Sequence, residues 1–317
     1  MWRPCIVCMR MPEVPEYPRA DRMQDIQPFR VMELLSRARQ LEAEGRNIVH
    51  MEIGEPDFPS PEPVIRAVKN AIAEGDVHYT PATGMLALRK AIAGFYLQRY
   101  GVLVEPERIV VTPGASGALL LVLGSLLNPG QTVLMADPGY PCNRNFVRFL
   151  EGRSSSIPVT AESGYQLTAE QVEANWDEST AAVLLASPSN PTGTLVPTDE
   201  LQAISRIVQQ RGGRLLVDEI YHGLVYDKKA ETILALNDEA FVINSFSKYF
   251  GMTGWRLGWL VAPEQYIDNI DCLAQNIFLS CSAPAQHAAV HAFNADCLKI
   301  LEQRRQAFQE RRDFLLP

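Results

Sequence analysis

The sequence predicts an α/β protein in which a seven-stranded, mainly parallel sheet lies between helices. Seven short apolar runs rich in β-branched residues are typical of buried strands, and segments with helical spacing separate most of them. Such an alternation predicts a parallel sheet that is covered on both faces. The runs lie at residues 108–112, 132–136, 155–159, 181–186, 214–218, 240–245 and 257–262, and the helices between them at 116–127, 142–151, 168–176 and 198–211.

Length and composition fit a folded protein with a sizeable core. The chain has 317 residues, of which 47% are hydrophobic and 21% are charged. Its net charge of −8 argues against a general nucleic-acid-binding protein and fits a cytoplasmic one. The longest apolar run, 118–127, is too short to span a membrane, and residues 1–20 lack the apolar core of a signal peptide.

The six cysteines form no regular framework, which predicts a reduced, intracellular protein. Cys5 and Cys8 form a single C-x-x-C pair. No second pair and no histidine pair at zinc spacing accompanies it, so we expect no metal site.

The residues ahead of the first strand are expected to form an arm, three helices and a short strand. The arm is the Pro-rich, poorly patterned stretch 1–22. Helical spacing predicts helices at 29–44, 61–74 and 86–100, and an apolar run predicts a strand at 48–53. The following stretch, 54–59, is either a simple turn or a backbone held open beside a ligand. In the second case Gly54 stands where a side chain would obstruct the ligand.

The stretch 240–261 reads AFVINSFSKYFGMTGWRLGWLV, a loop between two buried runs. The loop holds Ser245, Ser247, Lys248 and Arg256. The hydroxyls and the arginine suit a phosphate, and a lysine among apolar neighbours can act as an amine nucleophile. A phosphate beside a reactive lysine suggests pyridoxal phosphate. The alternative is a surface lysine in a Gly-rich turn.

In parallel sheets ligands gather at the carboxyl ends of the strands, and four further strand ends carry candidate residues. Gly114-Ala115-Ser116 is either an anion-binding turn at a helix start or an ordinary turn capped by Ser116. Tyr140 could stack on a flat ring or simply pack, and Asn190 offers an amide donor or an Asn-Pro turn.

Asp218 ends an apolar run, where a carboxylate is unfavourable without a partner. A protonated ring nitrogen would provide one.

Taken in order, these motifs resemble class I/II aminotransferases. The series is NPTGT, then D-E-x-Y, then S-x-S-K, then an arginine eight residues after the lysine. The resemblance runs from about residue 24 to the last residue. It implies pyridoxal 5'-phosphate as cofactor and the aspartate aminotransferase fold, fold type I, with a large domain and a small one.

The resemblance also implies a role for each candidate residue. Lys248 matches the Schiff-base lysine that moves the proton, and Asp218 the partner of the ring nitrogen. Tyr221 and Asn190 match the donors to the ring's phenolic oxygen. The remaining matches are Tyr140 stacked on the ring, Ser245, Arg256, Gly114, Ala115 and Ser116 around the phosphate, Tyr79 reaching the neighbouring subunit's phosphate, and Gly54 and Asn190 beside the substrate.

These roles predict a homodimer with shared active sites that exchanges an amino group between an L-amino acid and a 2-oxo acid. Two alternatives stay open, because the motifs describe the cofactor and not the bond broken. One is another reaction on the same fold, such as β-elimination or decarboxylation. The other is a cofactor-binding protein with little turnover.

The expected domains are an arm at 1–22, part of the small domain at 23–60, the large cofactor-binding domain at 61–284, and a long helix from 285. Family members continue beyond residue 317 into a small-domain segment with an arginine that binds the substrate's α-carboxylate. The sequence therefore predicts an incomplete small domain, slow turnover, and exposed or loosely packed side chains at Phe308, Phe314 and Leu315.

Overall fold

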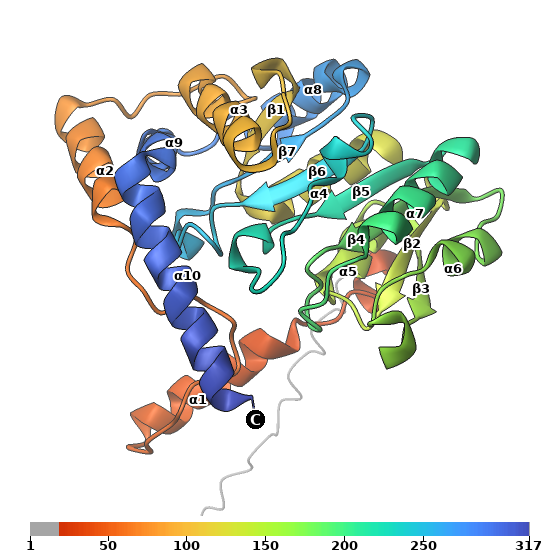
Figure 1. Cartoon of the computed structure of the whole chain (residues 1–317), viewed down its shortest axis with the longest axis horizontal. Coiled ribbons are helices and arrows are strands. Elements are labelled where there is room, and N and C mark those ends of the chain that lie inside the picture. The colour runs from red at the N-terminus through yellow and green to blue at the C-terminus, as the bar shows by residue number, and fades with distance from the viewer. Residues whose placement is uncertain (1–18, 317) are drawn as a thin grey trace, which may run out of the picture.

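The computed structural model describes residues 19–316 and contains the predicted seven-stranded sheet (Figure 1). The strand order is β1-β7-β6-β5-β4-β2-β3. All neighbouring pairs are parallel except those that β7 makes with β1 and with β6. The strands are β1 Ile109–Thr112, β2 Thr132–Asp137, β3 Arg153–Pro158, β4 Thr180–Ala186, β5 Arg214–Asp218, β6 Phe241–Ser245 and β7 Gly258–Val261.

Helices cover both faces of the sheet and create two separate cores. Side chains alternate between the faces along each strand. On β5, Leu215 and Val217 belong to the core under one face and Leu216 to the core under the other. The first core is covered by α3 Leu86–Tyr100, α6 Ala169–Ala174, α7 Thr198–Gln210 and α9 Ala283–Val290, and the second by α4 Gly114–Leu126, α5 Cys142–Phe149 and α8 Ile267–Ile277.

Three helices remain, and two of them contribute buried residues (Val64, Cys297 and Leu301) to the first core. They are α1 Arg30–Ala43, α2 Glu62–Glu74 and α10 Ala295–Leu315. Short 3-10 helices occur at Asp21–Gln24, Pro106–Arg108, Ala161–Ser163, His222–Leu224, Ile233–Ala235, Thr253–Trp255, Glu264–Tyr266 and His291–Phe293.

The sequence predictions for the strands and helices of the sandwich are confirmed, with strand ends displaced by no more than two residues. The predicted strand at 48–53 is wrong. A strand needs a neighbour for its backbone hydrogen bonds, and no strand pairs with this stretch among residues 19–316. Two of its apolar side chains point into solvent, with Val49 80% and Met51 83% exposed.

The long C-terminal helix begins later than the sequence predicted. Helix α9 ends at Val290, and a 3-10 turn follows. Asn294 then has an extended backbone, which separates this turn from α10. Near the end of α10, Phe314 and Leu315 are exposed as expected. Phe308 differs, because its ring packs edge-on against Phe58 with the centroids 5.4 Å apart.

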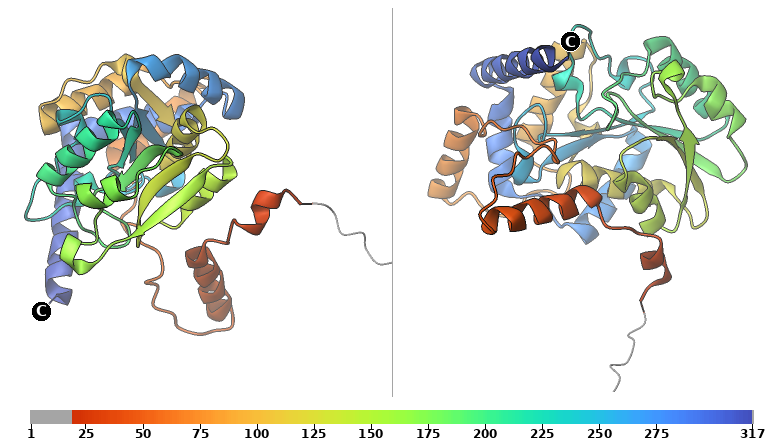
Figure 2. Two further views of the ribbon diagram at one scale, coloured as in Figure 1. Left: turned by 90° about the vertical axis from the view of Figure 1, so that its right-hand side faces the viewer. Right: turned by 90° about the horizontal axis from the view of Figure 1, so that it is seen from below.

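Helices α1 and α10 overlap in Figure 1, but the two views of Figure 2 separate them. Helix α1 buries none of its residues. Helix α10 instead contacts the stretch 54–60, where Arg311 Nη1 lies 2.9 Å from Asp57 Oδ1. The predicted arm lies outside the described residues except for 19–22, as do Cys5 and Cys8. None of the helices in residues 19–316 is long and apolar enough to cross a membrane.

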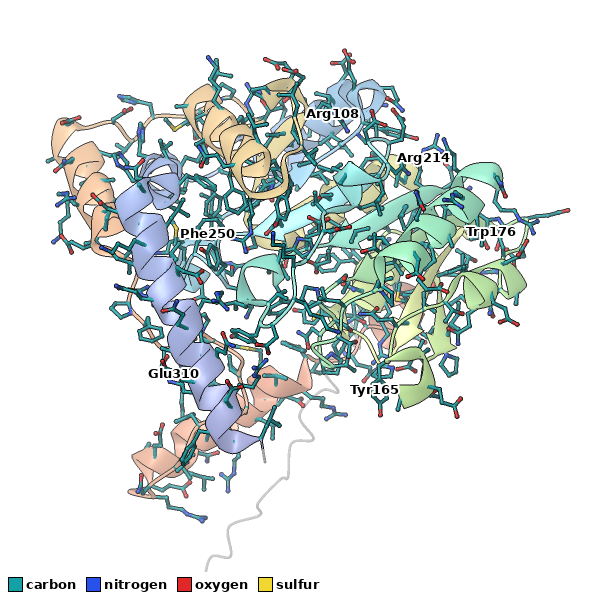
Figure 3. The ribbon with its side chains drawn as sticks, in the orientation of Figure 1. Arg108, Tyr165, Trp176, Arg214, Phe250 and Glu310 are labelled. Atoms are coloured by element: carbon teal, nitrogen blue, oxygen red, sulfur yellow. The ribbon has the colours of Figure 1, made fainter. Side chains whose placement is uncertain are left out.

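An aromatic cluster supports the loop that follows β6. The rings of Phe246 and Trp259 lie 4.9 Å apart, and Phe250 lies 5.1 Å from both Phe246 and Phe293. Figure 3 shows Phe250 between α10 and the sheet. Because Phe246 and Phe250 are buried on either side of Lys248, they fix the backbone that carries the lysine.

Candidate active site

The candidate residues lie together along one side of the sheet, at the strand ends, where β1, β4, β5 and β6 end and β7 begins. Figure 3 labels Arg214, the first residue of β5, at the opposite edge, and Asp218 ends the same strand. Since β7 runs antiparallel to its neighbours, the loop before it, with Arg256, returns to the edge that bears Lys248.

Lys248 is partly buried and points toward the stretch that begins at Gly54. Its Nζ donates a hydrogen bond to the Gly54 carbonyl oxygen at 2.7 Å and lies 5.9 Å from the centre of the Tyr221 ring. Burial lowers the pKa of Lys248, the nearby Arg256 lowers it further, and Glu55 acts in the opposite direction. A lowered pKa favours the neutral amine, which is the nucleophilic form.

Asp218 lies at the end of β5 without a cationic partner. Its Oδ1 accepts a hydrogen bond from the Ile220 N–H at 3.1 Å, and it forms no ion pair within residues 19–316. Burial raises the pKa of Asp218 to about 6. A carboxylate in this position is stabilised when a cationic group such as a protonated ring nitrogen binds beside it.

Asn190, which follows β4, and Tyr221, which follows β5, contact each other. Asn190 Nδ2 lies 3.3 Å from the Tyr221 hydroxyl oxygen. Burial, and then the charge of Asp218, raise the pKa of Tyr221, which keeps its hydroxyl protonated. Burial, then Cys142, and then the charges of Tyr221 and Asp218 raise the pKa of Tyr140. The ring of Phe29 meets Tyr140 edge-on at 5.8 Å.

The turn at the start of α4 is shaped to receive an anion beside Arg256. Gly114 has a φ of +73°, and a Cβ there would lie 2.7 Å from Arg256 Nη2, so only glycine fits. Helix α4 begins at Gly114 with Pro113 at its N-cap and no side-chain cap. Ser116 is therefore not a cap; it lies exposed in the first turn, where N–H groups are free to bind a phosphate.

Ser245 lies deeper than the rest of the phosphate set. Its Oγ accepts a hydrogen bond from the Ser247 N–H at 3.0 Å and lies 3.1 Å from the Leu257 carbonyl oxygen. The Ser245 hydroxyl thus joins the end of β6 to the residue before β7.

Gly54 and Tyr79 are the two candidates at the margin of the site. A Cβ at Gly54 would meet no protein atom within 4 Å, so the space beside it is open to a ligand. Tyr79 is 82% exposed and lies in the loop before α3, with its side chain free to reach another molecule.

Sequence reasoning missed four residues that shape this edge. Gly258 lets β7 approach the turn, since a Cβ there would lie 2.8 Å from the Gly114 carbonyl carbon. Glu55 contributes its charge next to Lys248. Glu219 and His222 form a buried pair directly behind Asp218, 3.5 Å apart. The acidic pair Asp218-Glu219 at the end of an apolar run was the available signal for the last two.

This set of residues fits pyridoxal 5'-phosphate. Asp218 is a partly buried carboxyl that a cationic partner would stabilise, Lys248 is an amine with a lowered pKa, and Gly114 with Arg256 forms a turn for a phosphate. A cleft of about 980 Å³ opens from Asn190 and Tyr221 toward Tyr226, but neither Lys248 nor Gly54 lines it.

Comparison with known proteins agrees with this arrangement. The sequence model described as Aminotransferase class I and II matches residues 46–317. The chain belongs to the class I and II aminotransferases. Like the enzymes of this family, it depends on pyridoxal phosphate and exchanges an amino group between an amino acid and a 2-oxo acid.

Several relatives cover most of this aminotransferase. A valine–pyruvate aminotransferase of Mycobacterium tuberculosis is 38% identical over 293 residues, which are 92% of this chain and 75% of the relative. A (5-formylfuran-3-yl)methyl phosphate transaminase of Methanocaldococcus jannaschii is 34% identical over 298 residues, 93% of this chain and 77% of the relative. Both are named for transamination, and neither is named for elimination or decarboxylation.

Solved structures of aminotransferases share the fold. The crystal structure of an aminotransferase from Mycobacterium tuberculosis superimposes with a TM-score of 0.91 at 37% identity, covering 95% of this chain and 78% of that one. Aspartate aminotransferase from Thermus thermophilus gives 0.90 at 30% identity, covering 94% and 79%. Fold type I, predicted from the sequence, is thereby confirmed.

Proposed function

We propose that Lys248 carries pyridoxal 5'-phosphate covalently and moves the proton at the substrate's α-carbon. The position of its amine supports this role: Nζ is held by the Gly54 carbonyl oxygen beside Tyr221, and burial lowers its pKa. The same Nζ atom can therefore act as a nucleophile and then accept and return a proton.

The neighbouring residues complete the ring site. When bound, pyridoxal phosphate supplies an electrophilic carbon and a ring that withdraws electrons from the substrate. Asp218 holds the proton at the ring nitrogen. Tyr221 and Asn190 donate hydrogen bonds to the ring's phenolic oxygen, and Tyr140 stacks on the ring.

The residues proposed to bind the phosphate and the substrate lie at the same strand ends. Arg256, Ser245 and the Gly114-Ala115-Ser116 turn bind the phosphate, the turn through its free N–H groups. Gly54 and Asn190 lie beside the substrate.

Borohydride reduction tests the role of Lys248. Reduction of the protein with pyridoxal phosphate should attach the cofactor to Lys248, as read by mass spectrometry of its peptides. Lys248→Ala should abolish both this product and transamination, because no other amine takes its place. Lys69→Ala, an exposed lysine of α2, is the matched control and should keep both.

Valine with pyruvate is the first substrate pair to assay, since the relative from M. tuberculosis is named for it. Attachment of the cofactor to a lysine other than 248 would refute the assignment. Cofactor attachment without turnover over a panel of amino donors would favour the alternative of a cofactor-binding protein.

The assembly and compartment belong to the same proposal. The protein is a cytoplasmic homodimer in which Tyr79 reaches the neighbouring subunit's cofactor phosphate. The exposure of Tyr79 supports the dimer, and the free thiols of the four described cysteines support a reducing compartment, which cell fractionation would check.

The proposed domain division keeps 61–284 as the cofactor-binding domain, with 23–60 and 285–317 in a smaller one and 1–22 as an arm. The contact of α10 with the stretch 54–60 supports the grouping of the two outer segments.

A further inference from the structure

The residue that follows strand β5, Glu219, carries a second carboxyl group. Leu215 and Val217 face the core beneath α3, and Leu216 faces the core beneath α4. Because side chains alternate along a strand, Asp218 points to the α4 side and Glu219 to the α3 side. The two carboxyls therefore belong to different environments.

The Glu219 carboxyl is enclosed, with the residue only 1% exposed. Its Oε1 accepts hydrogen bonds from the Thr232 hydroxyl and the Ile233 N–H, both at 2.9 Å. Its Oε2 has no hydrogen-bond partner among the described residues, and His222 Nδ1 lies 3.5 Å away. No arginine or lysine within residues 19–316 forms an ion pair with it.

His222 is buried beside Glu219 and is neutral, because burial and then the nearby Arg99 lower its pKa to about 3. Its Nδ1 lies 3.1 Å from the Tyr100 hydroxyl of α3, and its ring contacts the backbone of Ser187. The Ser187 N–H in turn donates to the Asp218 carbonyl oxygen at 3.0 Å. His222 thus connects α3 with the ends of β4 and β5.

The other titratable groups around Glu219 offer no positive charge to its carboxyl. Tyr96 and Tyr100 of α3 face it with pKa values raised by burial, so both stay neutral. The exposed Arg99 directs its hydrogen bond to the His222 carbonyl oxygen, at 3.3 Å. Burial, with a smaller contribution from the charge of Asp218, raises the pKa of Glu219 to about 8.

We propose that Glu219 is held as the neutral acid and forms, with His222, an uncharged support behind Asp218, which is left as the single charged carboxyl at the end of β5. A proton on Oε2 gives that atom a donor facing the unprotonated Nδ1 of His222, whose single lone pair also faces the Tyr100 hydroxyl. Glu219 and His222 are then positioning residues, and this inference rests on the proposed role of Asp218.

Proton release on unfolding tests the proposal in the cofactor-free protein. A carboxyl that is protonated in the folded protein and ionised in the unfolded chain releases its proton on unfolding between the two pKa values, here 4.5 and about 8. The stability due to this proton is complete below the lower value and is lost as the pH rises to the upper one. At about pH 6.5 the wild-type protein should release about one proton more than Glu219→Gln.

Glu170→Gln, an exposed carboxyl of α6, is the matched control and should leave the proton count unchanged. Equal proton release by wild type and Glu219→Gln would overturn the proposal. Infrared spectra give a second measurement that needs no variant of Glu219. The Asp218→Asn protein at neutral pH should show the carbonyl stretch of a protonated carboxyl, and its absence would also overturn the proposal.

Cofactor affinity separates this inference from the proposed function. Glu219→Ala should weaken binding of pyridoxal phosphate by roughly tenfold, as loss of an outer partner does at other sites, and Glu219→Gln should recover most of that loss. If Glu219→Gln weakens cofactor binding as much as Glu219→Ala does, a neutral side chain at position 219 is not what supports Asp218. If Asp218→Asn itself leaves cofactor affinity and turnover unchanged, the proposed function fails while the proton count still stands.

Discussion

The Asp218 carboxylate lowers the stability of the cofactor-free protein at neutral pH. The carboxyl accepts a hydrogen bond from Ile220 but forms no ion pair with any residue that the structure describes, and burial raises its pKa from 3.8 to about 6. The unfolded chain ionises first as the pH rises, so the free energy of unfolding falls between pH 3.8 and about 6 and stays lower above that range. A shift of this size corresponds to about 3 kcal/mol.

The first prediction concerns this conflict between stability and function. Above pH 6, Asp218→Asn should raise the free energy of unfolding of the cofactor-free protein by up to about 3 kcal/mol, because the buried charge is gone. Near pH 4 the two proteins should differ little. The same variant should lose transamination by orders of magnitude, since asparagine cannot hold the proton at the ring nitrogen.

Urea unfolding at both pH values, with and without pyridoxal phosphate, measures these effects. Added cofactor should stabilise the wild-type protein more than the variant. An asparagine variant that is less stable than wild type at neutral pH would show that the Asp218 carboxylate already has a stabilising partner.

The site residues that could be predicted from sequence are those with a distinctive chemical type at a strand end. Lys248, Asp218 and Asn190 each stood out against an apolar run, and the structure brings them to one edge. Glu219 and Gly258 could not be assigned, because their roles depend on which side of the sheet they face and on how closely two segments approach.

At the scale of elements, α10 is connected to the lysine through the stretch 54–60. The Phe308 ring packs against Phe58, and Arg311 bonds to Asp57 with both oxygens within 3.1 Å. The same stretch begins at Gly54, whose carbonyl oxygen accepts the hydrogen bond from Lys248.

We therefore predict that Phe308→Ala loosens the stretch 54–60. The ring is only partly buried, so the loss of unfolding free energy should be about 1–2 kcal/mol, below the range for a core phenylalanine. Limited proteolysis and hydrogen exchange at 54–60 would detect the change. Phe314→Ala, on the same helix but 90% exposed, is the matched control. Equal effects of the two variants would show that the packing against Phe58 contributes nothing.

The elements of the sandwich were predictable because each is defined by its own periodicity. The stretch 48–53 was not, since an apolar run becomes a strand only when a neighbouring strand accepts it. His50 instead contacts Glu52 and Glu42, at 2.6 and 2.9 Å, which ties the stretch to α1. The break before α10 depends on the extended backbone of Asn294, which a helical pattern over 285–316 does not reveal.

At the scale of the whole molecule, the proposed dimer makes each site depend on two chains. Tyr79 would serve its partner's phosphate, whereas Lys248 would serve its own site. A mixed dimer of Lys248→Ala and Tyr79→Phe subunits then has one site with both changes and one with neither. We predict that mixing the two variants, with subunit exchange, gives more activity than the mean of the separate proteins.

Steady-state rates of the mixture, with sedimentation to verify the dimer, measure this recovery. Mixing Lys248→Ala with Asp218→Asn subunits is the control, because both residues would serve the same chain's site and each type of subunit keeps its own defect. In the mixed dimers of that control every site stays defective. Recovery in both mixtures would refute the crossing role of Tyr79.

The position of β7 sets the order in which the site can be completed during synthesis. Strand β1 pairs only with β7, so the Gly114 turn and the Lys248 loop are joined through a strand that ends at Val261. A ribosome must deliver almost 150 residues after β1 before that strand gains its neighbour. A nascent chain that ends before β7 contains Lys248 and Asp218. It lacks the strand that joins the Lys248 loop to the Gly114 turn. We therefore expect the protein to bind its cofactor late, only after β7 has completed the sheet.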